Sequence, residues 1–347
     1  MLYSVFKGAP EQIGYAYGQK FSDLIRQNTA ILVKRTGFEP LPESNPEFCA
    51  WITGQEDIIS KYWPWLITEI KAAAEGSGQS FRDILFLNLR AWQYSLYGAP
   101  QQLCSSMVIT LAGGSIANAG ALDDDRRYYQ GLVHIVPDTG YAFLTFPIGG
   151  TCWGNRGINS AGLCIGESSQ IIQGLNKFPE TICADIAVRI ILQTCRTVRE
   201  VREFCTRHPF TLNLVCCDAE GGVFCAHATS AGLFEISDSA PCALTNHVSD
   251  DSIMQSLNSR GAQSFPESPT TRLRRGRLLS FCKSMNGSAG SDEIKKFIAD
   301  RLSGRRDSTC PPGNIVLTYA NSQNEKGKLW VAEPQITGHE EWEVFSL

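Results

Sequence analysis

The chain has 347 residues, of which 43% are hydrophobic and 19% are charged, and its formal net charge is −4. A chain of this length can bury a sizeable core without disulfides or metals. The small negative charge, with no long run of one sign, argues against nucleic acid or an anionic membrane as a partner.

Targeting signals are not evident in the sequence. No stretch approaches the roughly 18 consecutive apolar residues of a membrane span. The first ten residues lack the apolar core of a signal peptide, and the ending Phe345-Ser346-Leu347 lacks the basic residue of a peroxisomal signal. We therefore expect a cytoplasmic protein.

Thirteen cysteines are spread from Cys49 to Cys310, with no Cys-X-X-Cys pair and only Cys216 and Cys217 adjacent. A zinc site would need paired spacings with His or Cys partners, and the five histidines are scattered. We therefore expect no metal site, and we interpret most of the cysteines as buried thiols that behave as small hydrophobic residues.

The first hundred residues predict helices. Apolar residues recur at helical spacing after Pro10-Glu11, and a second series contains Pro64, which kinks or breaks a helix. The segment from Ser80 to Asp83 resembles a capping box and opens a third helix that extends to Trp92.

At Cys104 the pattern changes to short β-prone runs, of which residues 107–111 and 115–122 predict a hairpin around a glycine turn. Further strands are expected at 128–136, 141–146, 162–166, 212–217, 223–226, 233–236, 243–245, 314–319 and 329–332, and further helices at 180–195, 198–208, 272–284 and 292–301. This order is typical of an α+β fold, with helices layered on antiparallel sheets. We expect a single domain of residues 1–347, with residues 248–270 as a surface excursion.

Cys104 occupies the first position of a predicted strand, directly after an all-helical segment. An enzyme with an N-terminal nucleophile needs that arrangement, because the thiol attacks the preceding carbonyl and hydrolysis then leaves a free α-amine beside the sulfur. The reference pKa values of an α-amine (about 7.7–8.0) and a thiol (about 8.5) are closely matched. One residue can thus supply both nucleophile and base. On local sequence alone, a buried structural cysteine is the stronger interpretation.

Six segments, which follow one another in the same order as in a known family, make a catalytic role for Cys104 the stronger interpretation. They are residues 8–18 (GAPEQIGYAYG), Tyr62-Trp63-Pro64, residues 83–88 (DILFLN), Cys104-Ser105-Ser106, residues 157–162 (GINSAG) and Thr245-Asn246-His247. Together they resemble the isopenicillin N acyltransferase family of autoproteolytic enzymes with an N-terminal nucleophile, over most of the chain. The resemblance implies a four-layer αββα sandwich of the N-terminal nucleophile hydrolase type. It also implies an inactive precursor, cut between Leu103 and Cys104 into an α fragment (residues 1–103) and a β fragment (residues 104–347) that stay associated.

The resemblance implies roles for three catalytic residues. Cys104 matches the nucleophile of both self-cleavage and turnover. Asp124, within the run Asp123-Asp124-Asp125, matches an aspartate that contacts the new N-terminus or the substrate amine. Asn246 matches an oxyanion-hole asparagine, whose NH₂ group can donate to the developing oxyanion. The implied activity is that of an acyltransferase or amidohydrolase working through an acyl-thioester on Cys104, on a small-molecule or peptide-like substrate of secondary metabolism.

The sequence departs from the family pattern near the substrate. Leu103 stands where glycine is frequent, and Gly166 where an asparagine that supports the oxyanion hole is common. Glu167 adds a carboxylate, which favours an amine-bearing or cationic substrate, and we expect Asp123, Glu167 and Ser168 to bind it. The expected partners are a small-molecule amide, amine or acyl-thioester. No cofactor is expected, although acyl-coenzyme A could serve as the acyl-donor substrate.

Other interpretations stay open. A papain-like hydrolase would need a histidine base, but His247 follows Asn246 directly, so in an extended strand their side chains point to opposite faces. An uncleaved, non-catalytic family member could instead act as a binding protein. The basic run from Arg272 to Arg277 is interpreted as a solvated helix face rather than a nucleic-acid site.

Overall fold

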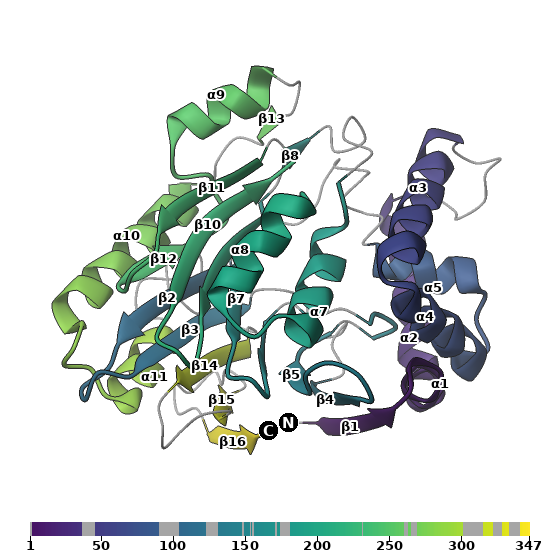
Figure 1. The fold of residues 1–347 in the computed structure, drawn as a ribbon, viewed down its shortest axis with the longest axis horizontal. Coiled ribbons are helices and arrows are strands. Elements are labelled where there is room, and N and C mark those ends of the chain that lie inside the picture. The colour runs from purple at the N-terminus through teal and green to yellow at the C-terminus, as the bar shows by residue number, and fades with distance from the viewer. Residues whose placement is uncertain are drawn as a thin grey trace.

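The computed structural model describes residues 2–36, 46–89, 104–122, 131–147, 149–152, 154, 156–170, 172–173, 181–230, 232–259, 263–264, 269–300, 315–321, 328–332 and 341–347. Within these residues, two β-sheets stack face to face and helices cover both outer faces (Figure 1). The predicted four-layer αββα arrangement of an α+β fold is confirmed.

The larger sheet has eight strands, and all its neighbouring pairs are antiparallel except the parallel pair β1–β4. Its order is β1 (Tyr3–Gly8), β4 (Leu132–Pro137), β5 (Phe143–Thr145), β6 (Gly157–Asn159), β7 (Cys164–Ser168), β9 (Leu212–Cys217), β10 (Val223–Thr229) and β11 (Gly232–Ser237). Side chains from alternate positions of its strands enter the space between the sheets, and the others face a helical layer.

The smaller sheet is antiparallel and carries the predicted nucleophile. Its order is β12 (Cys242–Leu244), β2 (Ser105–Thr110), β3 (Ile116–Leu122), β14 (Ile315–Asn321), β15 (Lys328–Ala332) and β16 (Trp342–Ser346). β8 (Ile172–Gln173) and β13 (Gln263–Ser264) pair separately beside α9 (Asp251–Ser259), at the upper edge of the view in Figure 1. The sheet edges formed by β1 and β16 lie side by side, and the rings of Tyr3 and Phe345 are 5.1 Å apart.

Helices α10 (Pro269–Met285) and α11 (Ser291–Ile298) cover the smaller sheet. Helices α7 (Ala184–Thr194) and α8 (Val198–Arg207) cover the larger one. The N-terminal helices are α1 (Pro10–Lys20), α2 (Ser22–Thr36), α3 (Pro46–Tyr62), α4 (Pro64–Ser77) and α5 (Phe81–Asn88). Pro64 breaks the predicted second helix, because α3 ends at Tyr62 and Pro64 takes the first helical position of α4, where its missing N–H costs nothing.

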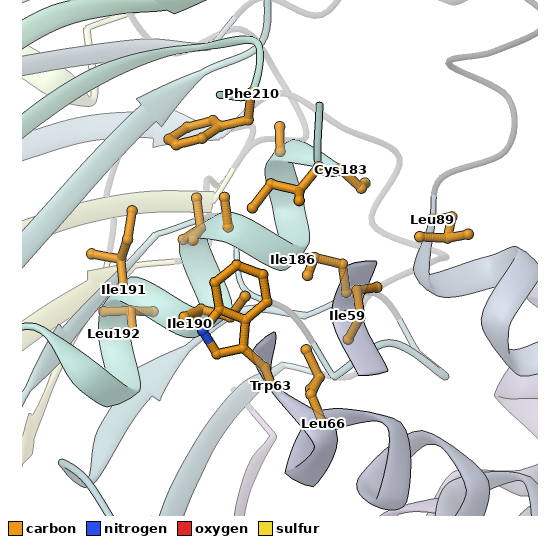
Figure 2. Packing of buried hydrophobic residues seen from close by; sticks show 14 of the residues in the cluster. Ile59, Trp63, Leu66, Leu89, Cys183, Ile186, Ile190, Ile191, Leu192 and Phe210 are labelled. Carbon is orange, nitrogen blue, oxygen red and sulfur yellow. The ribbon is translucent and has the colours of Figure 1, made fainter. Parts of the chain in front are cut away.

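Helix α7 fixes the N-terminal helices to the rest of the molecule. Every residue from Ala184 to Gln193 is buried, which is typical of a helix enclosed on all sides. Figure 2 shows Ile186 and Ile190 of α7 facing Ile59 and Trp63 of the α3–α4 region. Residues before Cys104 and residues after it therefore share one hydrophobic core.

The elements that were not predicted from the sequence are β1, β16, α9 and the short strands β6, β8 and β13. The sequence interpretation left residues 248–270 as a surface excursion, but α9 forms within it and buries Ile253 beside Val248. None of the described helices is long and apolar enough to cross a membrane.

Candidate active site

Cys104 is buried directly before β2, and strand register determines which residues lie beside it. In the β12–β2 pair, Leu244 lies opposite Ser106 and Ala243 opposite Met107. Continuing this antiparallel register by two residues brings Asn246 beside Cys104. The two residues that the sequence predicted as nucleophile and oxyanion donor therefore lie at the same end of neighbouring strands.

A buried arginine joins these two residues. Arg274 of α10 is 0% exposed, and its Nη1 donates to the carbonyl oxygen of Cys104 at 2.7 Å and to Oγ of Ser105 at 2.9 Å. Its Nη2 donates to Oδ1 of Asn246 at 3.0 Å. A single planar guanidinium thus fixes the position of Asn246 relative to Cys104 and the start of β2.

The interpretation of residues 272–277 as a solvated helix face is wrong for Arg274. Helical spacing contains the missed signal, because Arg274 stands four residues before Leu278 and eight before Cys282, and both of these are buried. Arg272 and Leu273, by contrast, are exposed. In this run of arginines, Arg274 is the residue that lies on the apolar face of the helix, and its guanidinium reaches Cys104 and Asn246.

The side-chain amide of Asn246 is held at both ends. Arg274 can only donate, so the atom that it contacts is the amide oxygen, and the orientation of the amide follows. Nδ2 donates one hydrogen to the carbonyl oxygen of Ser169 at 3.1 Å, and its second hydrogen has no partner among the described residues. The backbone N–H of Asn246 donates to Oγ1 of Thr271 at 3.0 Å.

A second buried arginine enters the same region from the opposite sheet. Arg156, directly before β6, is 0% exposed, and its Nη2 donates to the carbonyl oxygens of Ser105 at 2.7 Å and Glu167 at 2.9 Å. Its Nε and Nη1 have no hydrogen-bond partner within the part of the chain that the structure describes. The guanidinium ties β2 to β7 immediately after Cys104. Arg156 carries no motif, and we find no signal in the sequence that identifies it.

Gly120 makes room for this guanidinium. A Cβ atom at position 120 would overlap both the carbonyl oxygen of Ser105 and Nη1 of Arg156. We therefore expect Gly120→Ala to lower the free energy of unfolding by about 1–3 kcal/mol and to lower kcat about 10-fold or more by displacing the nucleophile strand. Urea unfolding and turnover assays measure the two effects.

The control for this prediction is Gly54→Ala in α3, where a Cβ atom would meet nothing within 4 Å. That substitution should leave kcat unchanged and raise stability by up to about 1 kcal/mol, because alanine favours the helix. If the two variants behaved alike, Gly120 would not be needed to seat Arg156.

The predicted substrate-binding residues of β7 lie on opposite faces of the sheet. Ser168 faces the nucleophile strand, with its Oγ 3.5 Å from Oγ of Ser106. Strand alternation directs the buried Glu167 carboxylate to the other face, although the Glu167 carbonyl accepts a hydrogen bond from Ser106. At Gly166, a Cβ would lie 2.7 Å from Oδ1 of Asn118 in β3, so an asparagine enters this space from the opposite sheet.

Leu103, Asp123 and Asp124 lie outside the described residues, so their predicted roles stay predictions. β3 ends at Leu122, which its register with β2 brings beside Cys104. The side chains of His247 and Asn246 have different partners, because Nδ1 of His247 lies 2.9 Å from Oγ1 of Thr271, while the Asn246 side chain points to Arg274.

The other cysteines resemble structural thiols. The eleven described cysteines other than Cys104 form no disulfide, and all of them except Cys152 are buried. Burial raises the pKa of Cys195 and of Cys282 to about 12, so both stay protonated at neutral pH. Among the residues with described positions, no group of three or more His, Cys, Asp or Glu side chains could hold a metal ion.

Residues 122–299, just over half of the 347-residue chain, match the model of the acyl-coenzyme A:6-aminopenicillanic acid acyl-transferase family. The chain belongs to this family. It is therefore an enzyme of the acyltransferase class. Asn246 and Arg274 lie inside the matched region, and Cys104 precedes it. No curated protein matches the sequence.

Solved structures with a similar arrangement include three amide hydrolases. A mutant of conjugated bile acid hydrolase from Clostridium perfringens is 14% identical over 70% of this chain and 92% of its own, with a TM-score of 0.47. Penicillin V acylase from Agrobacterium tumefaciens is 14% identical over 70% and 86%, with a TM-score of 0.43. The Caenorhabditis elegans ortholog of N-acylethanolamine-hydrolyzing acid amidase is 12% identical over 70% and 100%, with a TM-score of 0.42.

Proposed function

We propose that this acyltransferase-family enzyme is made as a precursor, cuts itself between Leu103 and Cys104, and then transfers acyl groups through a thioester on Cys104. The observation that carries the proposal is the Arg274 guanidinium, which hydrogen-bonds both the Cys104 carbonyl and the Asn246 side chain. Arg274 thus connects Cys104, a buried thiol at the start of a strand, to the side-chain amide of Asn246, whose second N–H is available to donate. Those are the elements of a nucleophile with an oxyanion hole.

Self-cleavage begins with attack of the Cys104 thiolate on the carbonyl carbon of Leu103. The proton that the thiol loses on forming the thiolate passes to the nitrogen, so the C–N bond breaks as the C–S bond forms and the nitrogen leaves as the neutral α-amine of Cys104. Water then hydrolyses the thioester, releasing the Leu103 carboxylate and restoring the thiol. The shared core supports continued association of the fragments, because β1 pairs with β4 and Glu69 of α4 forms a buried ion pair with Arg189 of α7 at 2.9 Å.

Turnover repeats this chemistry on an external acyl donor. The α-amine of Cys104 accepts the thiol proton while the sulfur attacks the acyl carbonyl carbon. The free N–H of Asn246 donates to the resulting oxyanion, and an interaction of this kind is worth roughly 3 kcal/mol in the transition state. The leaving group takes the proton from the α-ammonium, which leaves an acyl-thioester on Cys104. Water or an amine then attacks the thioester carbonyl, gives its proton to the α-amine, and releases the thiol.

The substrate side of the proposal rests on the predicted residues. Asp124 comes two residues after the end of β3 in the sequence, and its proposed role is to orient the α-amine or the incoming nucleophile, with the adjacent Asp123 binding substrate. Ser168 lies on the face of β7 that looks toward Cys104, so it is the β7 residue suited to contact the acyl group. The family description names an acyl-coenzyme A donor and an amine acceptor. We propose the same two classes here, for a substrate of secondary metabolism, and we no longer assign Glu167 to its recognition, because strand alternation directs that carboxylate away from Cys104.

A trapping experiment tests the proposal. Purified protein is mixed with acyl-coenzyme A thioesters of increasing chain length, quenched in acid, and examined by peptide mapping. We expect one acyl group per molecule, on the peptide that contains Cys104, released faster when a primary amine is added. Acylation of a different cysteine, or of Cys104 and buried Cys282 alike, would contradict the assignment.

A further inference from the structure

Asn213 of β9 holds the backbone on both sides of Asn246. Its side chain is 0% exposed and crosses the space between the two sheets. Nδ2 of Asn213 donates to the carbonyl oxygen of Thr245, and at 3.2 Å to the carbonyl oxygen of His247. Both N–H groups of the Asn213 side chain therefore donate to the backbone of Thr245 and His247, the two residues that flank the proposed oxyanion donor Asn246.

The oxygen of the same amide is fixed by two other side chains. Oδ1 of Asn213 accepts hydrogen bonds from Nε2 of Gln170 and from Nδ1 of His227. The backbone N–H of Ser249 donates to Nε2 of His227 at 3.1 Å, so the ring proton must be on Nδ1. Burial lowers the pKa of His227 to about 3, and the imidazole is therefore neutral near neutral pH. All four hydrogen-bonding positions of the Asn213 amide are occupied.

The network reaches Asn246 by a second route. Gln170, which donates to Asn213, follows Ser169, and the Ser169 carbonyl accepts from Nδ2 of Asn246. Asn213 thus contacts the backbone on either side of Asn246. Through Gln170 it is also connected to the Ser169 carbonyl, which accepts the hydrogen bond from the Asn246 side chain. None of these hydrogen bonds involves Cys104 or Arg274.

We propose that Asn213 is a positioning residue that sets the direction of the Asn246 N–H toward the oxyanion, with His227 and Gln170 orienting Asn213. The proposal rests on the proposed role of Asn246. A displacement of about 1 Å in a catalytic group can cost roughly 100-fold in rate, so the backbone on either side of Asn246 needs this degree of constraint. Asn213 touches no reacting atom and acts only through Asn246.

A matched control exists in the same molecule. Asn159 is also 0% exposed, and its Nδ2 donates to the carbonyl oxygens of Leu192 and Cys195 at 2.9 and 2.7 Å. Its Oδ1 accepts from the backbone N–H groups of Ala161 and Leu163. Asn159 therefore makes the same pattern of two donations and two acceptances, but it braces the β6–β7 turn against the end of α7.

The experiment is a double-mutant cycle that combines Asn213→Asp with Asn246→Ala, and uses Asn159→Asp as the control. Aspartate has nearly the same shape as asparagine but offers at most one donor in place of two. With an acyl-coenzyme A donor, we expect Asn213→Asp to lower kcat roughly 10- to 100-fold and to change KM less than about 3-fold. In the Asn246→Ala background it should lower kcat less than about 3-fold further, because coupled residues are not additive. Asn159→Asp should lower Tm and leave kcat within about 3-fold.

Failures of the two proposals can be distinguished. If Asn246→Ala left kcat unchanged, the oxyanion assignment in the proposed function would fail. If Asn246→Ala lowered kcat, the oxyanion assignment would stand. The positioning role of Asn213 would then be overturned by either of two results: an Asn213→Asp variant that lowers kcat by the same factor with and without Asn246→Ala, or one that lowers kcat no more than Asn159→Asp does. Should Asn213→Asp not fold, Asn213→Ser enters the same cycle, because the smaller side chain loses one donor without adding a carboxyl group, and the same losses are expected.

Discussion

Replacing Cys104 by alanine is expected to abolish self-cleavage and to lower kcat by at least about 10³-fold, because the sulfur that forms both acyl bonds is removed. The thiol lies in the inter-sheet core, so the small truncation should leave the fold intact. Gel electrophoresis measures the cleavage, and an acyl-coenzyme A assay measures the turnover. Cys104→Ser should keep slow cleavage, because its hydroxyl is a weaker nucleophile.

Cys282→Ala is the control for this prediction. Cys282 is fully buried on α10, and burial raises the pKa of its thiol to about 12. Its loss should lower the free energy of unfolding by about 1–2 kcal/mol without changing cleavage or kcat. If Cys104→Ala still formed products at the wild-type rate while Cys282→Ala did not, the nucleophile would have been assigned to the wrong thiol.

Arg274→Met is expected to lower kcat by roughly 10²–10³-fold, because it removes the guanidinium that fixes Asn246 against the nucleophile strand. It should also lower the free energy of unfolding by about 2–4 kcal/mol, since buried acceptors on Cys104, Ser105 and Asn246 each lose a charged donor. Arg274→Lys should recover only part of kcat, because one ammonium cannot span the same acceptors.

Arg272→Met on the same helix separates this effect from a general loss of positive charge. The Arg272 side chain is exposed, so we expect its loss to change stability by less than about 0.5 kcal/mol. Turnover and urea unfolding measured on both variants provide the comparison. A wild-type kcat for Arg274→Met would show that the bridge between Cys104 and Asn246 has no catalytic role.

The layered fold could be predicted from the sequence because its main elements have strong local patterns. The apolar positions of the helices, and the break at Pro64, are visible in residue spacing. β1 was missed because its partner β4 lies more than a hundred residues away in the chain, and its buried positions include the polar Ser4. α9 was missed because it is short and lies within residues 248–270, whose many Ser, Asp and Gly residues favoured the interpretation as a surface excursion.

The site was predictable only where a family motif marks it. Cys104 and Asn246 come from such motifs, and Arg274 hydrogen-bonds both of them. Arg156 and Asn213 have no local signal, because each acts across the space between the sheets on backbone atoms distant in the sequence. Arg274 did have a signal in helical spacing, but the surrounding basic residues obscured it.

The most direct test of the account is the intact mass of the purified protein, measured beside its Cys104→Ala variant. Self-cleavage predicts two wild-type fragments, one ending at Leu103 and one beginning at Cys104, that remain together until denatured. The Cys104→Ala variant should give a single mass close to the 38.2 kDa of the full chain. A single full-length mass for wild-type protein that is active on an acyl-coenzyme A donor would contradict the account.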